Sequence, residues 1–457
     1  MNETKELAHF IADIAYGDLT PKVIEKTKGL ILDQLGCELA FAALPWNKAV
    51  YKYIQDKIGS RGESTIVYYG PKTTVEDAAF ANASFGHGFE MDDTEMHALT
   101  HPGSVVIPSA LALGENKKIS GRELLVAIVA GYDAMVRIAM ASRTSIERSF
   151  HGTALNGPFG SAAATCKILG MPADTIVNAL GIAASESSGI SEYTISGGSV
   201  KRLHAGFAAQ AGVRATLLAG HGLTGPATAL EGKKGYCQAF ANKCYVEEIT
   251  AALGKEFRIM WTGNKPYCCC AAQHTVIDAT AAIIKEHPLR PEEIEKIIVE
   301  QMPREVNSVG NIIEPQDITA AQFSGRFGVA LRIIKGGNGF NDYTMENIRD
   351  PAILDLVHKI DYIANEKLGE KSSDAAPAIV TIKLKNGQVY VKGVDYASGT
   401  VSNPMTIKEL EEKFRALAAM AVSNDRIQKI IQMVMGLEDL DDISRLVPLL
   451  IANKNQS

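Results

Sequence analysis

The spacing of apolar residues changes twice along this chain, and that change restricts the folds that the sequence can adopt. Up to about residue 264 the apolar residues recur at the spacing of a helical face, as in "LTPKVIEKTKGLILDQLG", where Thr20 suits the N-cap and Pro21 the first helical position. After residue 264, "IEKIIVEQMP" has the β-branched composition of a strand. "AIVTIKLKNGQVYVKGVDY" predicts a hairpin, because Asn386-Gly387 is favoured in a type I′ turn.

Helical patterns also occur within and after this second region. "AQFSGRFGVALRIIKGG" and "NIRDPAILDLVHKI" have helical spacing, and beyond Pro404 a capping box of Thr406 and Glu409 precedes "LEEKFRALAAM". We therefore predict a mainly α chain with an α+β insertion. A large helical domain, discontinuous in sequence, would comprise residues 1–264 and 404–457, and residues 265–403 would form a smaller α+β domain.

Charge and composition argue against several classes of partner. The 457 residues carry a formal net charge of −6 and the sequence pI is about 6.0, whereas a nucleic-acid-binding protein usually has a basic face. A local basic pocket for a small anion is compatible with this charge. The longest strongly apolar stretch, residues 124–132, is too short to cross a bilayer, and the N-terminus lacks the pattern of a signal peptide. We expect a soluble cytoplasmic protein with no membrane and no nucleic-acid partner.

The seven cysteines do not follow a metal or disulfide pattern. The sequence has no CxxC pair, which argues against a zinc knuckle, and their odd number in a chain of this length argues against a disulfide framework. Cys268, Cys269 and Cys270 are adjacent, so they cannot all point at one metal. We interpret them as buried thiols or as one active-site thiol.

The most polar stretch of the chain, "DDTEMHALTHPG", spans residues 92–103. His97 and His101 are four residues apart, a spacing that could hold a metal on one helical face, although Pro102 disfavours a helix at His101. Alternatively, Asp93 could orient one of these histidines as a general base. A third interpretation is a solvated polar loop, and the spacing alone does not decide between the three.

Three further stretches contain candidate site residues. "RSFHGTALNGPFG" places His151 in a Gly-rich turn before a helix, where it could meet an anion or serve only as a cap. "GGSVKRLHAG" contains Lys201 and Arg202, which suit carboxylate recognition but could be an exposed charge pair. "GNKPYCCCAAQHTVIDA" places Lys265 and His274 at the predicted domain boundary, a common position for small-molecule sites.

Several common catalytic motifs are absent from the sequence. It contains no GxGxxG after a strand, no P-loop, no GxSxG and no HExxH, which argues against nucleotide-dependent chemistry, serine hydrolysis and zincin proteolysis. What remains is histidine, aspartate and lysine chemistry on a small anion.

Taken together, these segments resemble the MmgE/PrpD family, which includes 2-methylcitrate dehydratase, cis-aconitate decarboxylase and iminodisuccinate epimerase. The resemblance runs nearly end to end and is carried by "GHGFEMDDTEMHALTHPG", "FHGTALNGPFGSAAATCKILGM", "KRLHAGFAAQAGVRATLLAGHGLTGPATALEGKKGY", "KPYCCCAAQHTVIDA", "AAQFSGRFGVALRIIKG" and "VDYASGTVSNPMTIKELEEKFR". It implies a large all-helical domain with a smaller α+β lid domain, a homodimer, a pocket between the domains, and catalysis without a metal or an organic cofactor.

The resemblance also implies which residues form the site. Matched by motif, they are Glu90, Asp92, Asp93, Thr94, His101, His151, Lys201 and Lys265. Two positions depart from the family pattern. Glu90 stands where much of the family has Asp, and Cys270 stands where the dehydratase and decarboxylase branches have a histidine.

We therefore predict a cofactor-independent acid–base enzyme that removes a proton next to a carboxylate of a small di- or tricarboxylate. The histidines would exchange protons, with Glu90 or Asp93 setting their orientation, while the basic residues would hold the carboxylates and stabilise developing negative charge. The predicted catalytic residues are His101, His151, Lys201, Asp93 and Glu90, and the predicted substrate-binding residues are Thr94, Arg202, Lys265, Cys270 and His274.

The favoured reaction is that of a dehydratase of the 2-methylcitrate type. An epimerase of the iminodisuccinate type and then a decarboxylase of the cis-aconitate type are the alternatives, because all three reactions can share an intermediate formed next to a carboxylate. A catalytically silent protein that binds a carboxylate metabolite is the non-enzymatic alternative.

Overall fold

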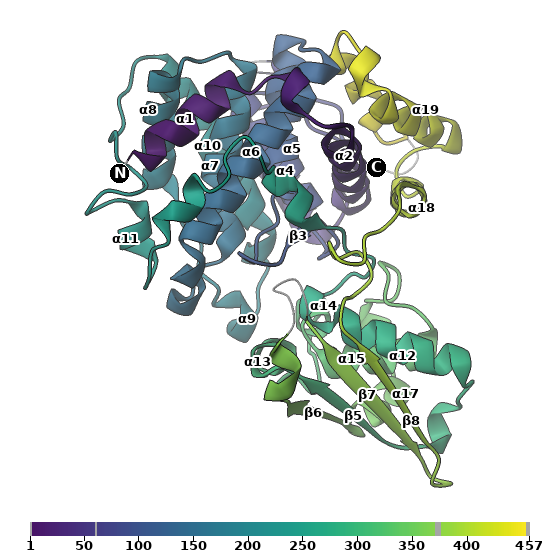
Figure 1. The fold of residues 1–457 in the computed structure, drawn as a ribbon. Helices are drawn as coiled ribbons and strands as arrows, with labels where there is room; N and C mark the ends of the chain where they lie inside the picture. Colours follow the sequence, from purple (N-terminus) through teal and green to yellow (C-terminus); the bar gives the residue numbers. More distant parts are fainter. Residues whose placement is uncertain (1, 60–61, 371–375, 454–457) are drawn as a thin grey trace.

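The computed structural model describes residues 2–59, 62–370 and 376–453. These residues form a mainly helical chain with a small mixed sheet, as the sequence predicts. Figure 1 shows two lobes, a larger one made of helices and a smaller one that contains the sheet.

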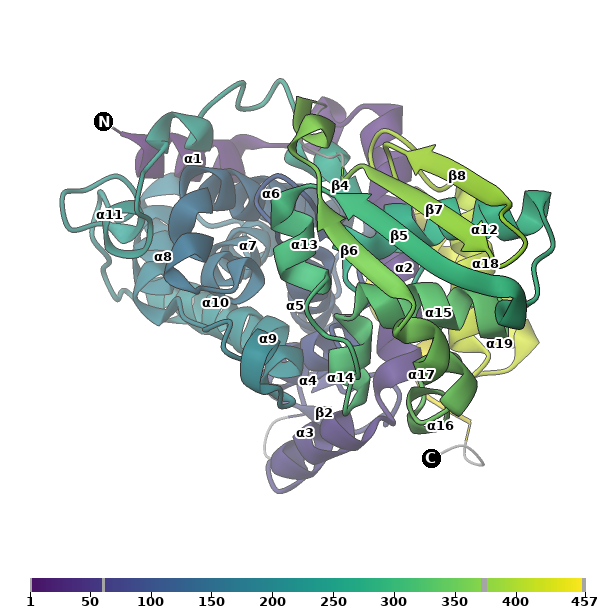
Figure 2. The ribbon, with the colours of Figure 1, turned by 90° about the horizontal axis from the view of Figure 1, so that it is seen from below.

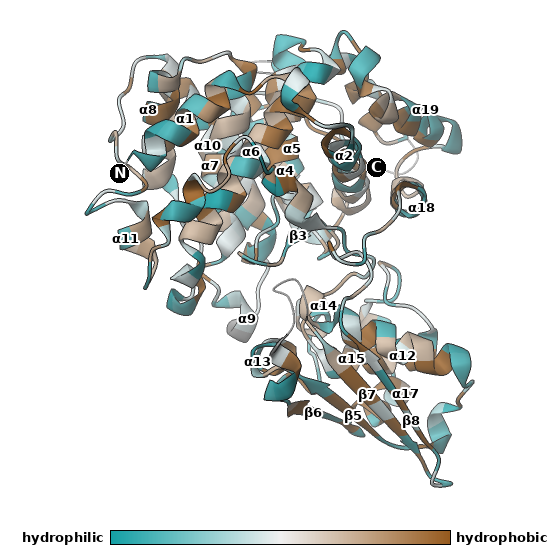
Figure 3. Ribbon diagram, viewed as in Figure 1, coloured by the Kyte–Doolittle hydropathy of each residue, from teal (hydrophilic) through white to brown (hydrophobic). Residues whose placement is uncertain are grey.

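Helices from both ends of the sequence form the larger lobe. Before the smaller lobe they are α1 (Glu3–Asp13), α2 (Pro21–Phe41), α3 (Pro45–Gln55), α4 (Val75–Gly86), α5 (Gly103–Lys117), α6 (Gly121–Ala141), α7 (Gly152–Ile168), α8 (Ala173–Glu186), α9 (Tyr193–Ser196), α10 (His204–Gly220) and α11 (Tyr236–Phe240). After it the chain returns through α18 (Ile407–Ala418) and α19 (Asn424–Met435), and α18 packs against α2. Figure 3 shows hydrophobic residues concentrated on central helices such as α5.

The predicted helix starts are confirmed. Thr20 accepts a hydrogen bond from the backbone at the start of α2, and Pro21 is the first residue of that helix. The capping box predicted before α18 is present, and Ser120 and Glu123 form a further one before α6. These caps satisfy backbone N–H groups that the first turn of a helix leaves without partners.

Helix α6 is buried in the larger lobe. Its 21 residues are long and apolar enough to cross a membrane by length and composition, but the apolar window is 100% buried inside the protein. The apolar residues 124–132 are thus one part of a longer helix. Packing of α6 against α7 accounts for this hydrophobicity, since a helix that is apolar on all sides is typical of a buried core.

Helices α7 and α10 approach each other closely because small residues line their contact. A Cβ at Gly157 would lie 2.6 Å from the Cβ of Ala208, and one at Gly212 would lie 2.4 Å from the Cβ of Ser161. A larger residue at either glycine would therefore push the helices apart. The close packing also brings the starts of α7 and α10 together. His151, which precedes α7, and His204, the first residue of α10, belong to the site described below.

One four-stranded sheet forms a layer of the smaller lobe, in the order β6-β5-β7-β8 (Figure 2). Strand β5 (Ile294–Gln301) runs parallel to β6 (Ile360–Ala364) and antiparallel to β7 (Ala378–Leu384), which pairs with β8 (Val389–Val394). Helices α12 (His274–Glu286) and α15 (Gly325–Lys335) pack against this sheet. The remaining helices of the lobe are α13 (Pro303–Val309), α14 (Ile318–Gln322), α16 (Met345–Ile348) and α17 (Pro351–Val357).

The hairpin between β7 and β8 is confirmed, but its turn differs from the predicted type I′. Such a turn needs positive φ at both central residues. Here Gly387 has a φ of 86°, whereas Asn386 is not among the residues with positive φ. The backbone N–H of Gly387 donates to the carbonyl of Leu384, and Leu384 N–H donates to the Gln388 carbonyl. This pattern is a three-residue loop with a glycine bulge, in which only the glycine needs the left-handed conformation.

Candidate active site between the two lobes

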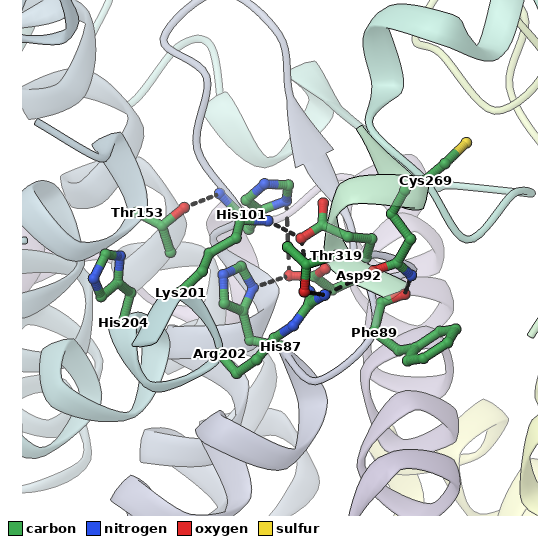
Figure 4. A network of polar contacts seen from close by, with 12 residues as sticks. His87, Phe89, Asp92, His101, Thr153, Lys201, Arg202, His204, Cys269 and Thr319 are labelled. Carbon is green, nitrogen blue, oxygen red and sulfur yellow. Dashed lines mark hydrogen bonds and ion pairs between the residues drawn. The ribbon is translucent and has the colours of Figure 1, made fainter. Parts of the chain in front are cut away.

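Four histidines lie together where helices of the larger lobe begin or end, and we call them the histidine cluster; Figure 4 shows His87, His101 and His204. His87 follows the last residue of α4, His101 lies two residues before α5, His151 is the N-cap of α7 and His204 is the first residue of α10. The ring centroids of His87 and His101 are 5.2 Å apart, those of His87 and His151 are 5.9 Å apart, and those of His151 and His204 are 5.0 Å apart. The end of α4 and the starts of α5 and α7 therefore meet at His87.

The carboxylate of Asp92 orients the histidine cluster. Its Oδ2 atom accepts a hydrogen bond from Ser104 Oγ at 2.6 Å and lies 2.7 Å from His87 Nδ1 and 3.6 Å from His101 Nδ1. Burial alone would raise the pKa of Asp92, but His87 and His101 hold it well below its usual range, so the carboxylate is ionised. The proton of neutral His87 then lies on Nδ1. His87 Nε2 is buried and has no hydrogen-bond partner among the described residues.

The backbone determines which nitrogen of His101 can accept a proton. His101 Nδ1 lies 2.6 Å from the backbone carbonyl oxygen of Asp93, so Nδ1 carries the hydrogen of the neutral ring. Thr94 Oγ1 lies 3.2 Å from the same nitrogen, and the backbone N–H of His101 donates to Thr153 Oγ1 at 3.0 Å. With the ring held on this side, Nε2 is the atom available for proton transfer.

Burial keeps the histidine cluster uncharged at neutral pH. It lowers the pKa of His87 to about 3 and that of His204 to about 4. It also lowers the pKa of His101, and it lowers the pKa of His151 well below the usual range, with repulsion from the neighbouring histidines adding to the effect. Neutral imidazoles are proton acceptors, so the cluster is suited to removing a proton from a bound molecule.

His151 and His204 form a pair at one end of the histidine cluster. Their Nδ1 atoms are 2.9 Å apart, so one ring donates a hydrogen bond to the other. Tyr193, at the start of α9, packs against both rings, with centroid distances of 5.7 Å and 5.6 Å. Because both rings are neutral, the pair can accept a proton, and it can act as a general acid only after one ring has taken up a proton.

Three basic side chains converge on one carboxylate in the second part of the site, and we call Lys201, Arg202 and Lys265 the basic cluster. Lys201 and Arg202 lie in the 3₁₀ turn Val200–Leu203 before α10, and Lys265 lies just after β4 (Thr262–Gly263). Lys201 Nζ contacts Glu90 Oε1, Arg202 Nη1 lies 2.9 Å from the same oxygen, and Lys265 Nζ lies 3.3 Å from Glu90 Oε2. These four residues are between 1% and 3% exposed, so their charges must be compensated inside the protein.

The smaller lobe completes the basic cluster through α14. Arg202 Nη2 donates to Gln322 Oε1 at 2.7 Å and to Thr319 Oγ1 at 3.4 Å. The amide nitrogen of Gln322 in turn donates to the backbone carbonyls of Phe89 and Cys268. Burial lowers the pKa of Arg202 to about 10, and the guanidinium still keeps its charge at neutral pH. Gln322 therefore ties the two lobes together at the residue that binds Glu90.

The pKa of Lys201 differs from that of an exposed lysine. Burial lowers it well below its usual range, and repulsion from Arg202 and Lys265 lowers it further. A lysine of lowered pKa can take part in proton transfer as well as in charge stabilisation.

A two-stranded ladder brings the histidine and basic clusters side by side. Strand β3 (Thr94–Glu95) pairs with β4, so that Thr94 lies opposite Gly263. This pairing connects the segment that carries Asp92 and His101 with the segment that carries Lys265. The two segments are far apart in the sequence, and the ladder explains why "DDTEMHALTH" and "GNKPYCCC" contribute to one site.

A cavity of about 340 Å³ opens beside both clusters. Tyr193, which packs against His151 and His204, lines it from the larger lobe. Thr319 and Phe323 line it from the smaller lobe, and the Phe323 ring lies 5.3 Å from Lys201 Nζ. Small-molecule pockets of proteins have volumes of a few hundred Å³. No residue of the histidine cluster or of the basic cluster lines this cavity; Tyr193, Thr319 and Phe323 lie between it and the two clusters.

Two predicted contacts differ from those in the structure. The carboxylate of Asp93 does not orient a histidine: it accepts hydrogen bonds from Gly103 N at 2.9 Å and from Tyr132 Oη at 2.6 Å, and only its backbone carbonyl reaches His101. Burial raises the pKa of Asp93 to about 7. His97 does not share a helical face with His101, because the backbone between them forms a turn instead of a helix. His97 Nδ1 lies 2.6 Å from the carboxylate of Glu95.

The predicted roles of three other residues also change with their surroundings. Glu90 contacts the basic cluster rather than a histidine, because its carboxylate points at Lys201 and Arg202. Cys270 is partly exposed, and its backbone N–H donates to the Gln322 carbonyl. His274 is buried apart from the histidine cluster, with Nε2 at 3.3 Å from the Cys269 carbonyl, and burial lowers its pKa to about 3.

The other two adjacent cysteines are buried thiols. Cys268 Sγ lies 3.2 Å from the sulfur of Met91, and burial raises the pKa of Cys268 to about 12. Burial also raises the pKa of Cys269. Thiols that keep their protons at neutral pH are poor nucleophiles, so these two match the first of the two interpretations offered for the cysteine run.

The sequence-based set of site residues omitted His87, His204, Gln322 and Tyr193. His87 could have been noticed, because it lies five residues before Asp92 in "GHGFEMDD". His204 follows Lys201 and Arg202 in "KRLHAG", but nothing in the spacing pairs it with His151. Gln322 and Tyr193 belong to segments that only the fold brings to the site.

The part of the chain that the structure describes has no group of three or more His, Cys, Asp or Glu side chains placed to hold a metal ion. The histidines of the site instead contact one another ring to ring. His87 is also bonded to Asp92, and His101 to a backbone carbonyl.

Comparison with known proteins places the chain among relatives of similar length. It is 28% identical to a cis-aconitate decarboxylase of Aspergillus terreus over 473 residues, which cover 98% of this chain and 95% of the relative. It is 29% identical to the cis-aconitate decarboxylase of Homo sapiens over 470 residues, covering 98% and 94%, and 27% identical to a cis-aconitate decarboxylase-like protein of Aspergillus oryzae over 474 residues, covering 98% and 97%.

Two family models account for most of the sequence. The MmgE/PrpD N-terminal domain matches residues 5–248, which include the histidine cluster, Glu90, Lys201 and Arg202. The MmgE/PrpD C-terminal domain matches residues 267–439, which include the sheet, Gln322 and helix α18. The resemblance drawn from the sequence motifs is confirmed: this chain belongs to the MmgE/PrpD family.

Proposed function

We propose that this protein is a lyase that acts on a small di- or tricarboxylate by acid–base chemistry. The observation that carries the proposal is the position of the basic cluster beside four neutral histidines, of which His87, His151 and His204 are buried and His101 is partly exposed. Basic side chains in a water-poor site hold carboxylates and stabilise negative charge that develops next to them. The neutral imidazoles beside them supply the base.

The two ends of the site would have different tasks. A substrate carboxylate would bind to the basic cluster, and His101 Nε2 would exchange a proton with the adjoining carbon. The His151–His204 pair with Tyr193 would serve as the second proton-transfer group at the other end of the histidine cluster. This division follows the geometry, because His101 Nδ1 is bonded to the backbone while the His151–His204 pair already shares a hydrogen.

Two lyase reactions fit this arrangement. The names of the relatives favour decarboxylation of cis-aconitate, in which a carbon–carbon bond to CO₂ breaks and a proton is added. Dehydration of a hydroxy acid such as 2-methylcitrate, the outcome favoured on the sequence, is the second candidate. Loss of hydroxide needs a proton donor opposite the base, and the His151–His204 pair would fill that role only after one of its rings has taken up a proton.

Proton NMR in D₂O would test the proposal. The purified, chelator-treated protein would be incubated with cis-aconitate, 2-methylcitrate, iminodisuccinate, citrate and tartrate. We expect loss of CO₂ from cis-aconitate, with deuterium added at a carbon next to a carboxylate, or loss of water from 2-methylcitrate, with a hydrogen removed from such a carbon. Epimerisation of iminodisuccinate without elimination would indicate an epimerase instead, and turnover only after addition of a divalent metal would contradict the cofactor-independent mechanism.

If no compound is changed, a thermal-shift screen with the same panel would distinguish a silent binding protein from an enzyme of another substrate. The homodimer and the cytoplasmic location expected from the resemblance stay predictions. Size-exclusion chromatography with light scattering and fractionation of cells would test them.

A further inference from the structure

The carboxylate of Glu90 occupies the place in the basic cluster where a substrate carboxylate would bind. We propose that Glu90 is an internal ligand of this subsite and that it determines which carboxylates can enter. The inference rests on the proposed function in one respect, namely that the basic cluster is the subsite for a substrate carboxylate.

The contacts of Glu90 are those expected of a bound anion. One oxygen contacts Lys201 Nζ and Arg202 Nη1, and the other contacts Lys265 Nζ. The other terminal nitrogen of Arg202 is already bonded to the smaller lobe, by Gln322 and Thr319. An incoming carboxylate that binds to Arg202 Nη1 must therefore share that nitrogen with Glu90 or displace it.

The backbone conformation of Glu90 indicates that the surrounding structure holds this residue in place. Its φ is 57°, in the left-handed region that non-glycine residues rarely adopt. Residues held in this region cluster at ligand sites, where the surrounding structure keeps them in place. Here the conformation aims a glutamate from the segment between α4 and β3 directly at the basic cluster. A change in this short segment could withdraw the carboxylate when another anion takes its place.

An internal ligand selects for substrates with more than one carboxylate. Because Glu90 is tethered, its effective concentration at the basic cluster is high, so a monocarboxylate that makes the same contacts competes poorly. A di- or tricarboxylate gains further contacts, for example near Tyr193 and the His151–His204 pair, and these contacts favour displacement of Glu90. Glu90 would thereby exclude small acids such as acetate from the site.

The substitution Glu90→Gln tests the inference, because glutamine keeps the length of the side chain but removes its charge. Isothermal titration calorimetry would use tricarballylate, a saturated tricarboxylate that lacks both the double bond and the hydroxyl, and acetate. We expect the variant to bind tricarballylate more tightly than the unmodified protein, on the order of tenfold or more, and to gain measurable affinity for acetate. Equal or weaker binding of both probes by the variant would overturn the inference.

Thermal unfolding provides a second readout in case the variant is unstable. Loss of the Glu90 charge leaves buried basic groups without compensation, so we expect a lower melting temperature that tricarballylate restores. The matched control is Asp133→Asn, which breaks the fully buried pair with Arg137 at 2.8 Å in α6. That variant should also be destabilised, but tricarballylate should not restore it beyond its effect on the unmodified protein. Equal restoration of both variants would contradict the inference.

If Glu90→Gln does not fold, Glu90→Asp replaces it in the same titrations. A side chain that is shorter by one carbon cannot make all three contacts equally well, so an intermediate gain in affinity is expected, and no gain would overturn the inference. The two proposals fail separately. Tighter binding by the variant, with no turnover of any compound by the unmodified protein, would support the internal ligand and contradict the lyase. Turnover by the unmodified protein, with no change in binding by the variant, would support the lyase and contradict the internal ligand.

Discussion

The histidine cluster and the basic cluster are buried to a similar extent, but the protein accommodates them in opposite ways. The histidines are left neutral, because burial lowers the pKa of His87 to about 3 and that of His204 to about 4. The basic side chains are compensated by a carboxylate, since Lys201, Arg202 and Lys265 all contact Glu90. Burial thus produces a base in one half of the site and an anion-binding centre in the other.

The two clusters also differ in the parts of the fold that build them. The histidine cluster comes only from the larger lobe, at the ends of α4, α7 and α10 and before α5. The basic cluster is complete only with Gln322 and Thr319 of α14 in the smaller lobe. The proton-transfer groups are therefore organised by the folding of one lobe, and carboxylate binding depends on how the two lobes meet. Four predictions test this division.

The substitution His101→Gln should have the largest effect, because it removes the proposed base and leaves the basic cluster intact. We expect kcat to fall about 1,000-fold, within the range for loss of a general base, while KM changes by less than about threefold. Steady-state kinetics on the substrate found by NMR would measure both values. His287→Gln is the control, since His287 is exposed and stacks on Tyr390 in the smaller lobe. A large rise in KM with unchanged kcat would show that His101 belongs to the binding half.

The substitution Lys265→Met should act on the other half of the site. Loss of one hydrogen bond to a charged group costs about 1.5–3 kcal/mol, so we expect the Kd for tricarballylate to rise about 10- to 100-fold. Calorimetry at constant ionic strength would measure this change. Lys285→Met, at an exposed position of α12, is the control. If Lys265→Met left the affinity unchanged, the basic cluster would not be the carboxylate subsite.

The histidine cluster should make the protein sensitive to acid. The pKa of His87 in the folded protein, about 3, is far below its value of about 6.5 in an unfolded chain, so the unfolded state binds its proton first. The stabilisation that results is complete above about pH 6.5 and is lost as the pH falls toward 3. Between pH 6.5 and pH 5, His87 should contribute a loss of about 2 kcal/mol.

The substitution His87→Gln tests this pH dependence, because glutamine cannot be protonated. Urea unfolding at pH 7 and pH 5 should show that the variant loses about 2 kcal/mol less stability than the unmodified protein over this interval. His287→Gln should behave like the unmodified protein. An identical loss in all three proteins would mean that His87 is protonated in the folded state or does not remain buried.

The smallest effect is expected for Gln322→Leu, which removes the amide that joins the lobes at Arg202. The neutral carbonyls of Phe89 and Cys268 lose their donor, and Arg202 loses one acceptor. We expect about a fivefold loss in affinity for tricarballylate, equivalent to about 1 kcal/mol, with no change in the acid sensitivity of stability. Gln388→Leu, in the exposed turn after β7, is the control. A change in acid sensitivity would contradict the independence of the two halves.

Local sequence was sufficient for features that depend on nearby residues. The helix starts at Thr20 and Thr406 follow from side-chain oxygens that bond to N–H groups in the first turn of the same helix. The strand at residues 294–301 and the hairpin position also follow from local pattern. The turn type was wrong, because Asn386-Gly387 fits two loop geometries that place the positive φ differently.

The amino-acid sequence by itself thus determined the helical and α+β regions, the family, and most of the side chains that reach the site. Only the tertiary structure decided which of them touch. Asp92 rather than Asp93 presents its carboxylate to the histidines, and Glu90 contacts lysine and arginine instead. The physical reason is that a carboxylate pairs with whatever donor lies within about 3 Å. That neighbour comes from the packing of α4, α5, α7 and α10 and from the β3–β4 ladder, which no spacing along the chain reveals.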